Sequence, residues 1–307
     1  MSSDAPILDV GRLRLLREVG LRGSIAGAAR SFGLTSSAVS QQLSALEKDA
    51  GTALVDRSPR GVSLTGAGLA LAARAGNLLD ILSAARADLD RIAGSIAGPV
   101  TIASVPSAAA TFVSGAVRSL RALHPGIAVS VRTAEPAHAF DVLMDSDVDL
   151  AVVDEYDHVP LALPELVVAR QLCAEALVLV ASSGSLGRRR PRLAELAQAD
   201  WVMPPEYAAC GQAVRSACRA SGFEPRVRWE TDDMLLLVRA VAHGHGIAVL
   251  PRMSVEAACG PAPGVDVWPL REPPLNRKLL AVGRASVLAR PVLEAVLAQL
   301  VTSAAGT

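Results

Sequence analysis

Polar side chains at the start of one predicted helix have the chemistry to read DNA base edges. Val39, Leu43 and Leu46 recur at helical spacing, so residues 35–50 are expected to form a helix with one apolar face. Serine hydroxyls and a glutamine amide can hydrogen-bond base edges in the major groove, or phosphates. The residues on the leading or outward side of this helix are Ser36, Ser37, Ser40 and Gln41. Ser36 can alternatively serve only as a helix cap.

The segments around this helix predict a winged helix–turn–helix. Apolar residues at helical spacing indicate a first helix over residues 10–20. Ser24 can cap a short second helix that stops at Gly33. The period then changes over residues 53–64, which favours a hairpin with a basic tip. This arrangement would place the helix over residues 35–50 in the major groove and the hairpin beside it.

Further cations and hydroxyls in this region suit the DNA backbone. Arg57 and Arg60 fall in the expected wing, where a guanidinium can bind phosphate or enter the minor groove. Arg57 can instead form an internal ion pair with Glu47 or Asp49. The remaining candidates for backbone contacts are Ser24 and Arg30.

The charge distribution agrees with a polyanionic partner. The formal net charge of the 307 residues is zero, but residues 10–74 hold nine basic and four acidic side chains, a surplus of five. An acidic surplus elsewhere balances it. A basic N-terminal region on a neutral chain favours one part that binds nucleic acid.

Several other classes of protein are disfavoured. No uncharged apolar stretch is long enough to suggest a membrane span, and the first ten residues lack the features of a secretory signal, so we expect a cytoplasmic protein. The four cysteines fit no zinc pattern. We find no catalytic triad and no phosphate-binding loop, so we expect neither an enzyme nor a cofactor or metal. A solute-binding protein remains the main alternative for the second half alone.

A long leucine-bearing helix is expected over residues 67–91. It would extend for roughly 40 Å. Such a helix needs a partner for its apolar stripe, and we expect the same helix of a second subunit, although packing on its own chain is the alternative. The Gly- and Pro-containing residues 94–99 then favour a hinge.

The second half predicts an α/β domain. Strands near residues 100–104, 127–132 and 148–153 alternate with helices, which favours a parallel sheet. A second set runs from about residue 166 to 270, with separate strands expected at 166–169 and 176–181. The chain then returns through a strand and a helix near its end, so two lobes are expected.

These motifs resemble the N-terminal signature of LysR-type transcriptional regulators. The matching residues are Gly23-Ser24, Ala28-Ala29, Ser36 to Leu43, Leu46-Glu47, Gly51, Leu54, Arg57, Arg60, Leu64-Thr65 and Ala67-Gly68. Segments 147–152, 222–225 and 241–251 are similar to the family's effector domain. The resemblance implies promoter DNA, a homodimer or homotetramer, an unknown small-molecule effector and a contact with RNA polymerase as partners.

The resemblance also implies a domain plan. A winged helix–turn–helix would occupy residues 1–66, a dimerisation helix 67–93 and a hinge 94–98. The effector-binding domain would follow at 99–307, in a fold resembling periplasmic binding proteins. Lobe I would hold about 99–164 and 271–307, and lobe II about 165–270.

Such a domain binds small molecules between its lobes, where strands end and helices begin. The candidates are Ser104, Pro106, Ser107, Pro205, Glu206, Thr231, Asp232, Gly246 and Ile247. Ser107 and the pair Thr231-Asp232 can alternatively be plain helix caps. Glu206 would repel a carboxylate, which favours a cationic or neutral effector unless its side chain faces solvent.

Cys210 and Cys218 fall close to the positions of the redox pair in peroxide-sensing members of the family. Eight residues of helix would separate them by about 12 Å, beyond the roughly 7 Å between Cα atoms that a disulfide allows. Thiol-based redox sensing is therefore a minority hypothesis beside small-molecule binding. The effector, the target genes and the choice between activation and repression are not encoded in any motif.

Overall fold

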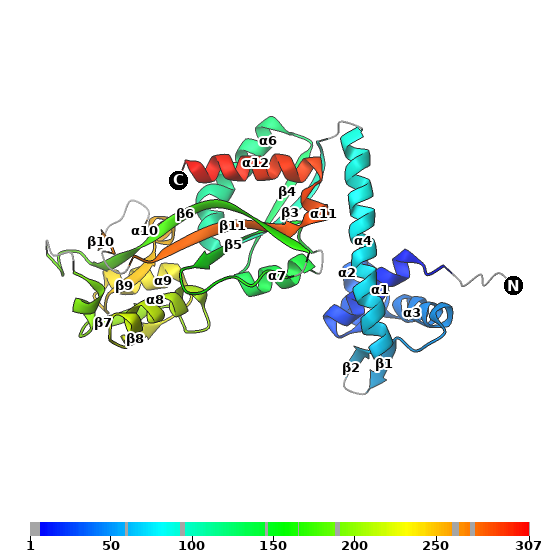
Figure 1. Cartoon of the computed structure of the whole chain (residues 1–307), viewed down its shortest axis with the longest axis horizontal. Coiled ribbons are helices and arrows are strands. Elements are labelled where there is room, and N and C mark those ends of the chain that lie inside the picture. Colours follow the sequence, from blue (N-terminus) through cyan, green and yellow to red (C-terminus); the bar gives the residue numbers. More distant parts are fainter. Residues whose placement is uncertain are drawn as a thin grey trace. The chain divides into compact units, whose positions relative to one another are not determined.

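A computed structural model describes residues 7–58, 61–92, 96–144, 147–164, 166–187, 191–259, 264–270 and 274–306. The chain forms two compact units, Met1–Gly94 and Ser95–Thr307, and each is described by itself (Figure 1). None of the described helices is long and apolar enough to cross a membrane.

The first unit is a winged helix–turn–helix. Helices α1 (Val10–Arg22), α2 (Ile25–Phe32) and α3 (Ser36–Ala50) are followed by the hairpin strands β1 (Val55–Ser58) and β2 (Gly61–Leu64). Each of the three helices ends at a glycine in the left-handed conformation, where a side chain would be strained. The core is aliphatic, as the scarcity of aromatic residues requires, and its central residues are Leu16, Val19, Ala28, Val39, Leu43 and Leu46.

The long helix α4 (Gly66–Ile92) is confirmed. Its first turn is fixed to the base of the wing: the Thr65 hydroxyl accepts from the Gly68 amide at 3.0 Å and donates to the Ala53 carbonyl at 2.8 Å. A Cβ on Gly68 would lie 2.0 Å from the Leu54 carbonyl oxygen, so this close approach requires glycine. The core of the first unit includes Ala75 of α4, while apolar side chains farther along the helix are exposed.

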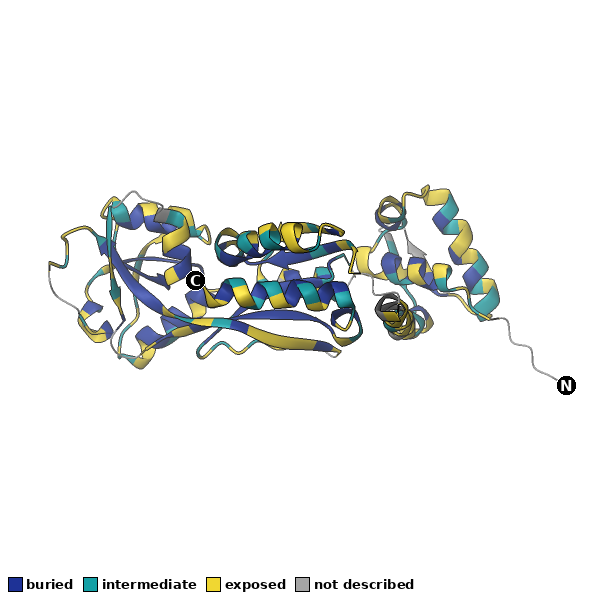
Figure 2. Cartoon of the chain, turned by 90° about the horizontal axis from the view of Figure 1, so that it is seen from above, coloured by how far each residue is buried: buried dark blue, intermediate teal, exposed yellow. Residues whose placement is uncertain are grey.

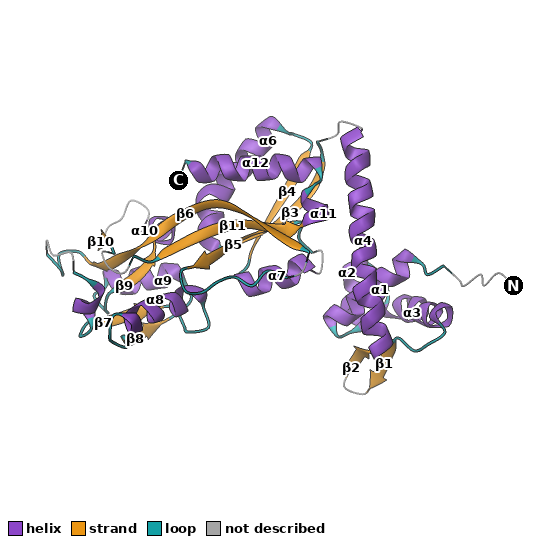
Figure 3. Cartoon of the chain, viewed as in Figure 1, coloured by secondary structure: helices purple, strands orange, loops and turns teal. Residues whose placement is uncertain are grey.

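The second unit is built on one large mixed sheet (Figure 3). Its strand order is β10 (Val265–Pro269), β6 (Val167–Ser182), β11 (Asn276–Arg284), β5 (Leu150–Tyr156), β3 (Gly98–Ser104) and β4 (Ile127–Thr133), and β9 (Ala248–Pro251) also pairs with β6. Strand β3 is parallel to β4 and β5, as expected. Strand β11 is antiparallel to both β5 and β6, so the sheet is mixed beyond the three strands for which a parallel arrangement was predicted. Strand β11 carries the chain back from lobe II into lobe I. It therefore runs in the direction opposite to β5 and β6, the strands on either side of it.

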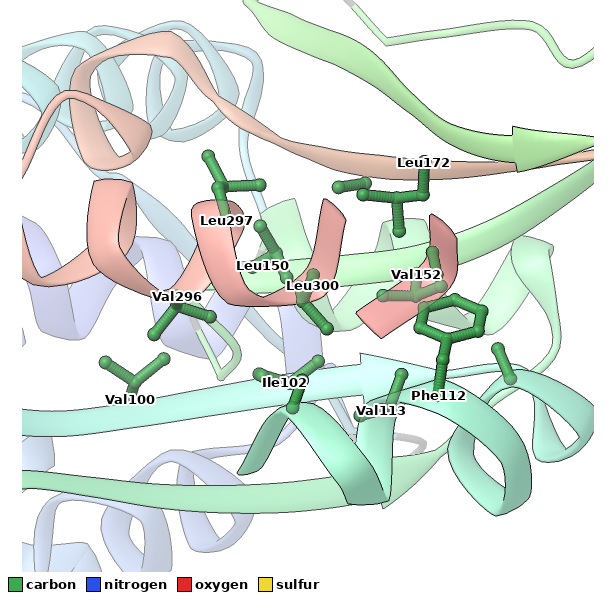
Figure 4. Packing of buried hydrophobic residues seen from close by; sticks show 14 of the residues in the cluster. Val100, Ile102, Phe112, Val113, Leu150, Val152, Leu172, Val296, Leu297 and Leu300 are labelled. Carbon is green, nitrogen blue, oxygen red and sulfur yellow. The ribbon is translucent and has the colours of Figure 1, made fainter. Parts of the chain in front are cut away.

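Lobe I has helices on both faces of this sheet. Ile102 and Leu150 point to one face, where helices α6 (Ser114–Leu123) and α12 (Pro291–Ala305) cover them. Figure 4 shows Val296 of α12 next to Val100 and Leu300 of α12 next to Ile102. The neighbouring Ala103 and Ala151 face the other way and pack against α7 (Pro136–Met144). This alternation is the period of a strand that is buried on both faces.

Lobe II repeats that layering around the second half of β6. Leu177 and Leu179 pack against α8 (Ala209–Ala220), whereas Val178 and Val180 pack against α9 (Met234–Ala242). The parallel pair β7 (Asp200–Met203) and β8 (Arg226–Glu230) lies beside them. Helix α10 (Arg252–Cys259), which the sequence pattern did not reveal, follows β9 directly.

One strand runs through both lobes, where two were expected. The strands expected at 166–169 and 176–181 both fall in β6, which begins at Val167 and continues without a break to Ser182. Leu172 joins the core of lobe I and Leu177 that of lobe II. A boundary between the lobes therefore falls inside one continuous strand. Figure 2 shows the buried residues following the strands from one end of the unit to the other.

Candidate functional site

The start of α3 carries the hydroxyls expected at a DNA groove. Thr35 is the N-cap, because its Oγ1 accepts from the Ala38 amide at 3.2 Å. Ser36 is the first residue of the helix and is exposed, so the alternative that Ser36 is the cap was wrong. Ser37 is exposed as well, and its Oγ lies 3.0 Å from Thr35 Oγ1.

The exposed face of α3 includes more residues than were predicted. Gln41 is fully on the exposed side, whereas Ser40 is half-buried at the edge of the core. Counting in steps of three and four from Ser37 through Gln41 adds Ser44 and Lys48, both exposed. Ser44 and Lys48 were not among the predicted contacts, which came from the first turns of the helix, although the same helical periodicity includes both residues.

The other predicted DNA contacts have different settings. Ser24 caps α2, with its Oγ accepting from the Gly27 amide at 3.0 Å, while Arg30 near the end of α2 is exposed. Arg57 lies in β1, but its side chain and the whole of Arg60 are outside the described residues. The wing contacts therefore stay predictions.

The two acids considered as partners of Arg57 have their own contacts. Glu47 Oε1 accepts from the amides of Leu54 and Val55 at 2.9 and 3.1 Å, which fastens the end of α3 to the start of the wing. Asp49 Oδ2 forms an ion pair with Arg12 at 2.6 Å. Both carboxylates thus hold the module together, a role that the sequence pattern did not indicate.

Two of the nine basic residues in this region are held in ion pairs with acids of the same unit. Arg12 is paired with Asp49, and Arg22 with Glu18. Exposed cations on the surface include Arg30, Lys48 and Arg74. Exposed cations such as these are free to approach phosphates, whereas the ion-paired arginines are less available.

In the second unit, the first candidate is joined to a residue far away in the chain. Ser107 begins the helical run after β3, through α5 (Pro106–Ala108) and one π-helical turn (Ala109–Val113). Its hydroxyl accepts from Arg277 Nη1 at 3.0 Å, and both side chains are buried. The capping alternative for Ser107 is wrong, because the N-cap position is Val105.

Two carboxylates surround the buried guanidinium of Arg277. Nη1 lies 3.3 Å from Asp154 Oδ2, while Nε donates to Glu175 Oε1 at 2.9 Å and Nη2 pairs with the same carboxylate. Burial alone would lower the pKa of Arg277, but Tyr156, Glu175 and Asp154 raise it above its ordinary value. The guanidinium is therefore always charged, and the carboxylates around it outnumber it.

Both carboxylates that contact Arg277 also accept a hydrogen bond from a further residue. Tyr156 donates to Asp154 at 3.0 Å, and burial, followed by the charge of Asp154, raises the pKa of Tyr156 well above its usual value. Glu175 Oε2 accepts from the Met253 amide at 2.8 Å at the start of α10. Ser107 of lobe I is thus linked through Arg277 and Glu175 to a helix of lobe II. We call Ser107, Asp154, Tyr156, Glu175 and Arg277 the Arg277 network.

The sequence argument did not find the Arg277 network beyond Ser107. Arg277 and Glu175 are cross-strand partners in register, as are Arg277 and Tyr156. The basic pair Arg277-Lys278 at the start of an apolar strand was the available signal, but finding the partners of Arg277 required the antiparallel register that was not expected.

Other candidates lie on the loop that follows β7 in lobe II. Arg215 Nη1 donates to the Pro204 carbonyl at 2.8 Å and Nη2 pairs with Glu230 at 2.7 Å, which fixes the loop after β7. A Cβ on Gly211 would lie 2.1 Å from the Pro205 carbonyl oxygen, so glycine lets α8 approach that loop. Glu206 is exposed and lies 3.4 Å from Arg219, so its charge is partly compensated at the surface.

The loop before α9 holds a second group of polar residues. Asp233, not Thr231 or Asp232, is the N-cap, because it accepts from the amides of Leu235 and Leu236. The capping alternative for Thr231-Asp232 was therefore one residue off. Asp232 instead accepts from the Tyr207 hydroxyl at 3.0 Å.

Glu135 belongs to the same neighbourhood. It follows β4 in lobe I, and partial burial, followed by the negative charges of Asp154 and Asp232, raises its pKa. These carboxylates come from both lobes. Glu135 was absent from the predicted site because its segment carried no motif.

The remaining candidates have mainly structural contacts. Ser104 is fully buried, and Pro106 is exposed at the helix start. Gly246 has a φ of 153°, and a Cβ there would lie 2.5 Å from the Asp200 carbonyl oxygen. Ile247 is buried beside Trp201, and its amide donates to Asp200 at 2.9 Å. Gly246 and Ile247 thus hold the end of β9 against β7.

Both cysteines of the redox hypothesis are buried on α8. Burial raises the pKa of the Cys210 thiol to about 12, and burial together with Glu224 raises that of Cys218 to about 12. Their separation along an intact helix, about 12 Å, forbids a disulfide without unwinding. The environment therefore opposes thiolate formation at both positions.

Comparisons with known proteins agree with this arrangement. Two family descriptions match the chain: "Bacterial regulatory helix-turn-helix protein, lysR family" over residues 10–69 and "LysR substrate binding domain" over residues 93–305. The nitrogen assimilation regulatory protein nac of Escherichia coli (strain K12) is 28% identical over 254 residues, covering 82% of this chain and 81% of that protein.

Solved structures share the fold. Full-length OxyR from Pseudomonas aeruginosa matches with a TM-score of 0.76 at 18% identity, covering 96% of this chain and 95% of that one. Full-length CbnR in complex with its target DNA matches with a TM-score of 0.56 at 20% identity, covering 96% and 99%. With both family descriptions matched in order along the chain, this protein belongs to the LysR family of bacterial transcriptional regulators and consists of a DNA-binding helix–turn–helix domain and an effector-binding domain.

Proposed function

We propose that this regulator binds promoter DNA as a homodimer or homotetramer and responds to a small molecule bound between lobes I and II. Binding of that effector would change the geometry of the oligomer and so the spacing of its DNA-binding units. The protein would act in the cytoplasm, with RNA polymerase as a further partner at the promoter, and we infer no catalytic activity.

The Arg277 network is the observation that carries the effector proposal. It joins Ser107 at the start of a lobe I helix to the start of α10 in lobe II through one buried guanidinium. A ligand that hydrogen-bonds Ser107 would compete with or extend this network, and both lobes would respond. The predicted contacts Ser104 and Pro106 stand next to Ser107 in the chain, and the lobe II candidates Pro205, Glu206, Thr231 and Asp232 follow β7 and β8.

The outward face of α3 supports the DNA contacts. Ser36, Ser37 and Gln41 are exposed there, and the positive end of the α3 dipole favours a phosphate near its first turn. Ser40 would contact DNA from the edge of this face. Arg30 and the wing arginines would contact phosphates on either side.

Helix α4 supports the oligomer. The exposed fractions of Leu78, Ile81, Leu82, Leu89 and Ile92 are 39%, 67%, 48%, 60% and 83%. Their spacing places them along one side of the helix, in continuity with Leu71 and Ala75, which pack inside the first unit. The apolar stripe of α4 thus continues beyond the part that packs in the first unit. This is the arrangement expected if the same helix of a second subunit packs against it.

The structure favours a small-molecule effector over redox sensing. Cys210 and Cys218 are buried, their thiols are protonated at neutral pH, and their spacing on α8 is too long for a disulfide. We therefore assign sensing to the inter-lobe site and give the cysteines a packing role.

A ligand screen on the full-length protein tests the proposal. Metabolites would be screened by thermal shift against the wild type and Ser107→Ala, with Ser216→Ala on the far part of α8 as a control. We expect a compound that raises the melting temperature of the wild type and the control but not of Ser107→Ala, and that alters an electrophoretic shift with the promoter next to the protein's own gene. A compound that stabilises all three proteins equally would place the effector elsewhere.

A further inference from the structure

Arg12 in the first turn of α1 contacts two side chains of α3 at once. Its Nε donates to Gln42 Oε1 at 3.0 Å, and its Nη1 pairs with Asp49 Oδ2 at 2.6 Å. Gln42 and Asp49 are separated by two helical turns, so they lie on the same flank of α3. Arg12 and Asp49 are 30% and 29% exposed, which leaves their pair partly shielded from water.

The contact sets the direction of the Gln42 amide. A guanidinium carries only donors, so the oxygen of the amide must face Arg12 and the NH₂ group must face away. Gln42 is exposed, and in the described part of the chain its NH₂ group has no acceptor. A surface glutamine that would otherwise rotate freely is thereby held with its donors outward.

We propose that Arg12 is a positioning residue for DNA recognition, which fixes Gln42 as a hydrogen-bond donor to a base. The outward NH₂ suits guanine O6 or N7 and thymine O4, whereas adenine is best read by a donor and an acceptor together. Gln41 has no such tether among the residues that the structure describes, and it offers both groups. The two adjacent glutamines therefore read different bases. This inference rests on the DNA binding of the family and not on the effector proposal.

Asp49 completes the arrangement. It neutralises the charge of Arg12 and pulls the guanidinium along α3, so that Nε rather than an Nη nitrogen meets Gln42. A neutralised arginine adds little attraction for phosphates. Arg12 should therefore influence which sequence is bound more than how strongly DNA in general is bound.

The test is a double-mutant cycle on the full-length protein. The wild-type protein would first select a duplex from random sequences. Each variant would then be measured on this selected duplex and on a scrambled duplex of the same length and composition. The specificity is the ratio of Kd values, that of the scrambled duplex divided by that of the selected duplex. We expect Arg12→Ala and Gln42→Ala each to lower this ratio by about 5-fold, the size of one hydrogen bond. The double variant should lose no more than Gln42→Ala alone, because Arg12 acts through Gln42.

Two conservative variants separate positioning from folding. Arg12→Lys keeps the pair with Asp49 but cannot span both partners, and Gln42→Glu gives Arg12 a better acceptor while removing the outward donor. Both should keep the wild-type melting temperature and lower the ratio of Kd values. Arg22→Ala, which removes another paired arginine of α1, is the matched control and should leave the ratio unchanged.

Three results would overturn the proposal. Additive losses in the cycle would mean that Arg12 only holds the fold. Equal losses on both duplexes in Gln42→Ala would place Gln42 on a phosphate. A decrease of about one in the salt dependence of binding for Arg12→Ala would mean that Arg12 itself contacts a phosphate.

Discussion

Arg277 and Ser107 are 170 positions apart in the chain, yet Arg277 Nη1 donates to Ser107 Oγ at 3.0 Å in the interior of the effector domain. The register of β11 between β5 and β6 makes this contact, because it places Arg277 opposite Tyr156 on one side and Glu175 on the other. Three segments of the chain thus meet at one guanidinium.

Removal of that guanidinium should be costly. Arg277→Met leaves Asp154 and Glu175 buried without their cation, and we expect the free energy of unfolding to fall by about 3–5 kcal/mol. All three tryptophans of the chain lie in the second unit, so urea unfolding followed by tryptophan fluorescence reports this unit alone. Adding Asp154→Asn to the variant should restore part of the loss. An unchanged midpoint for Arg277→Met would contradict the role of the network.

Glu135 should make the effector domain less stable as the pH rises. Its pKa in the folded protein is raised above the ordinary 4.5, so folding favours its protonated form. Stability is therefore lost between pH 4.5 and the raised pKa, and Glu135→Gln should recover it at neutral pH without effect well below pH 4.5. Urea midpoints of both proteins across this pH range would show it. Parallel pH profiles would disprove the prediction.

Gly68 should tolerate no side chain. Gly68→Ala places a methyl group against the Leu54 carbonyl and should destabilise the first unit by about 1–3 kcal/mol, measured by calorimetry of the full chain. Gly66→Ala is the control two residues away, where a Cβ meets nothing within 4 Å, and it should be neutral or slightly stabilising. Equal effects of the two substitutions would show that the close contact between α4 and Leu54 does not contribute to the stability of the first unit.

The exposed stripe of α4 should carry self-association. Leu82→Gln and Leu89→Gln together should raise the dissociation constant of the oligomer by at least 10-fold, because each buried leucine contributes on the order of 1.5–3 kcal/mol. Sedimentation equilibrium would measure it. Ala73→Gln, an exposed position on another side of the helix, should not change the assembly. If the double variant has the same mass in solution as the wild-type oligomer, α4 is not the interface.

Gln41 and Lys48 should affect DNA binding in different ways. Gln41→Ala should lower the preference for the selected duplex by roughly 1–3 kcal/mol, because a base contact is lost. Lys48→Ala should weaken binding to all duplexes alike and reduce the salt dependence by about one, as the loss of one phosphate contact does. Fluorescence anisotropy at several salt concentrations separates the two. Identical behaviour of the variants would refute the distinction between the two residues.

The first unit was predictable because its signals are local. Leu13, Leu16 and Val19 of α1 and Val39, Leu43 and Leu46 of α3 repeat at helical spacing, and a glycine ends each helix. The hydrogen bond between the Thr65 hydroxyl and the Gly68 amide is likewise local, because it joins residues three positions apart.

The effector site was less predictable because its contacts depend on pairing between distant strands. Ser107 could be named from its place after a strand, but Arg277, Glu175 and Tyr156 become neighbours only in an antiparallel register. The hydrophobic pattern of β11 is the same for either direction of the strand, so it holds no information on that register. The contact between Arg12 and Gln42 escaped notice for a similar reason, because it joins two helices through polar side chains.

The continuity of β6 limits how the effector domain can move. A strand that supplies Leu172 to one core and Leu177 to the next cannot act as a free hinge, since wide opening would break its ladder with β11. The irregularity in that ladder between Leu279 and Leu280 is the place where it can flex. The two lobes should therefore move relative to each other by a small twist of this shared strand pair rather than by wide opening.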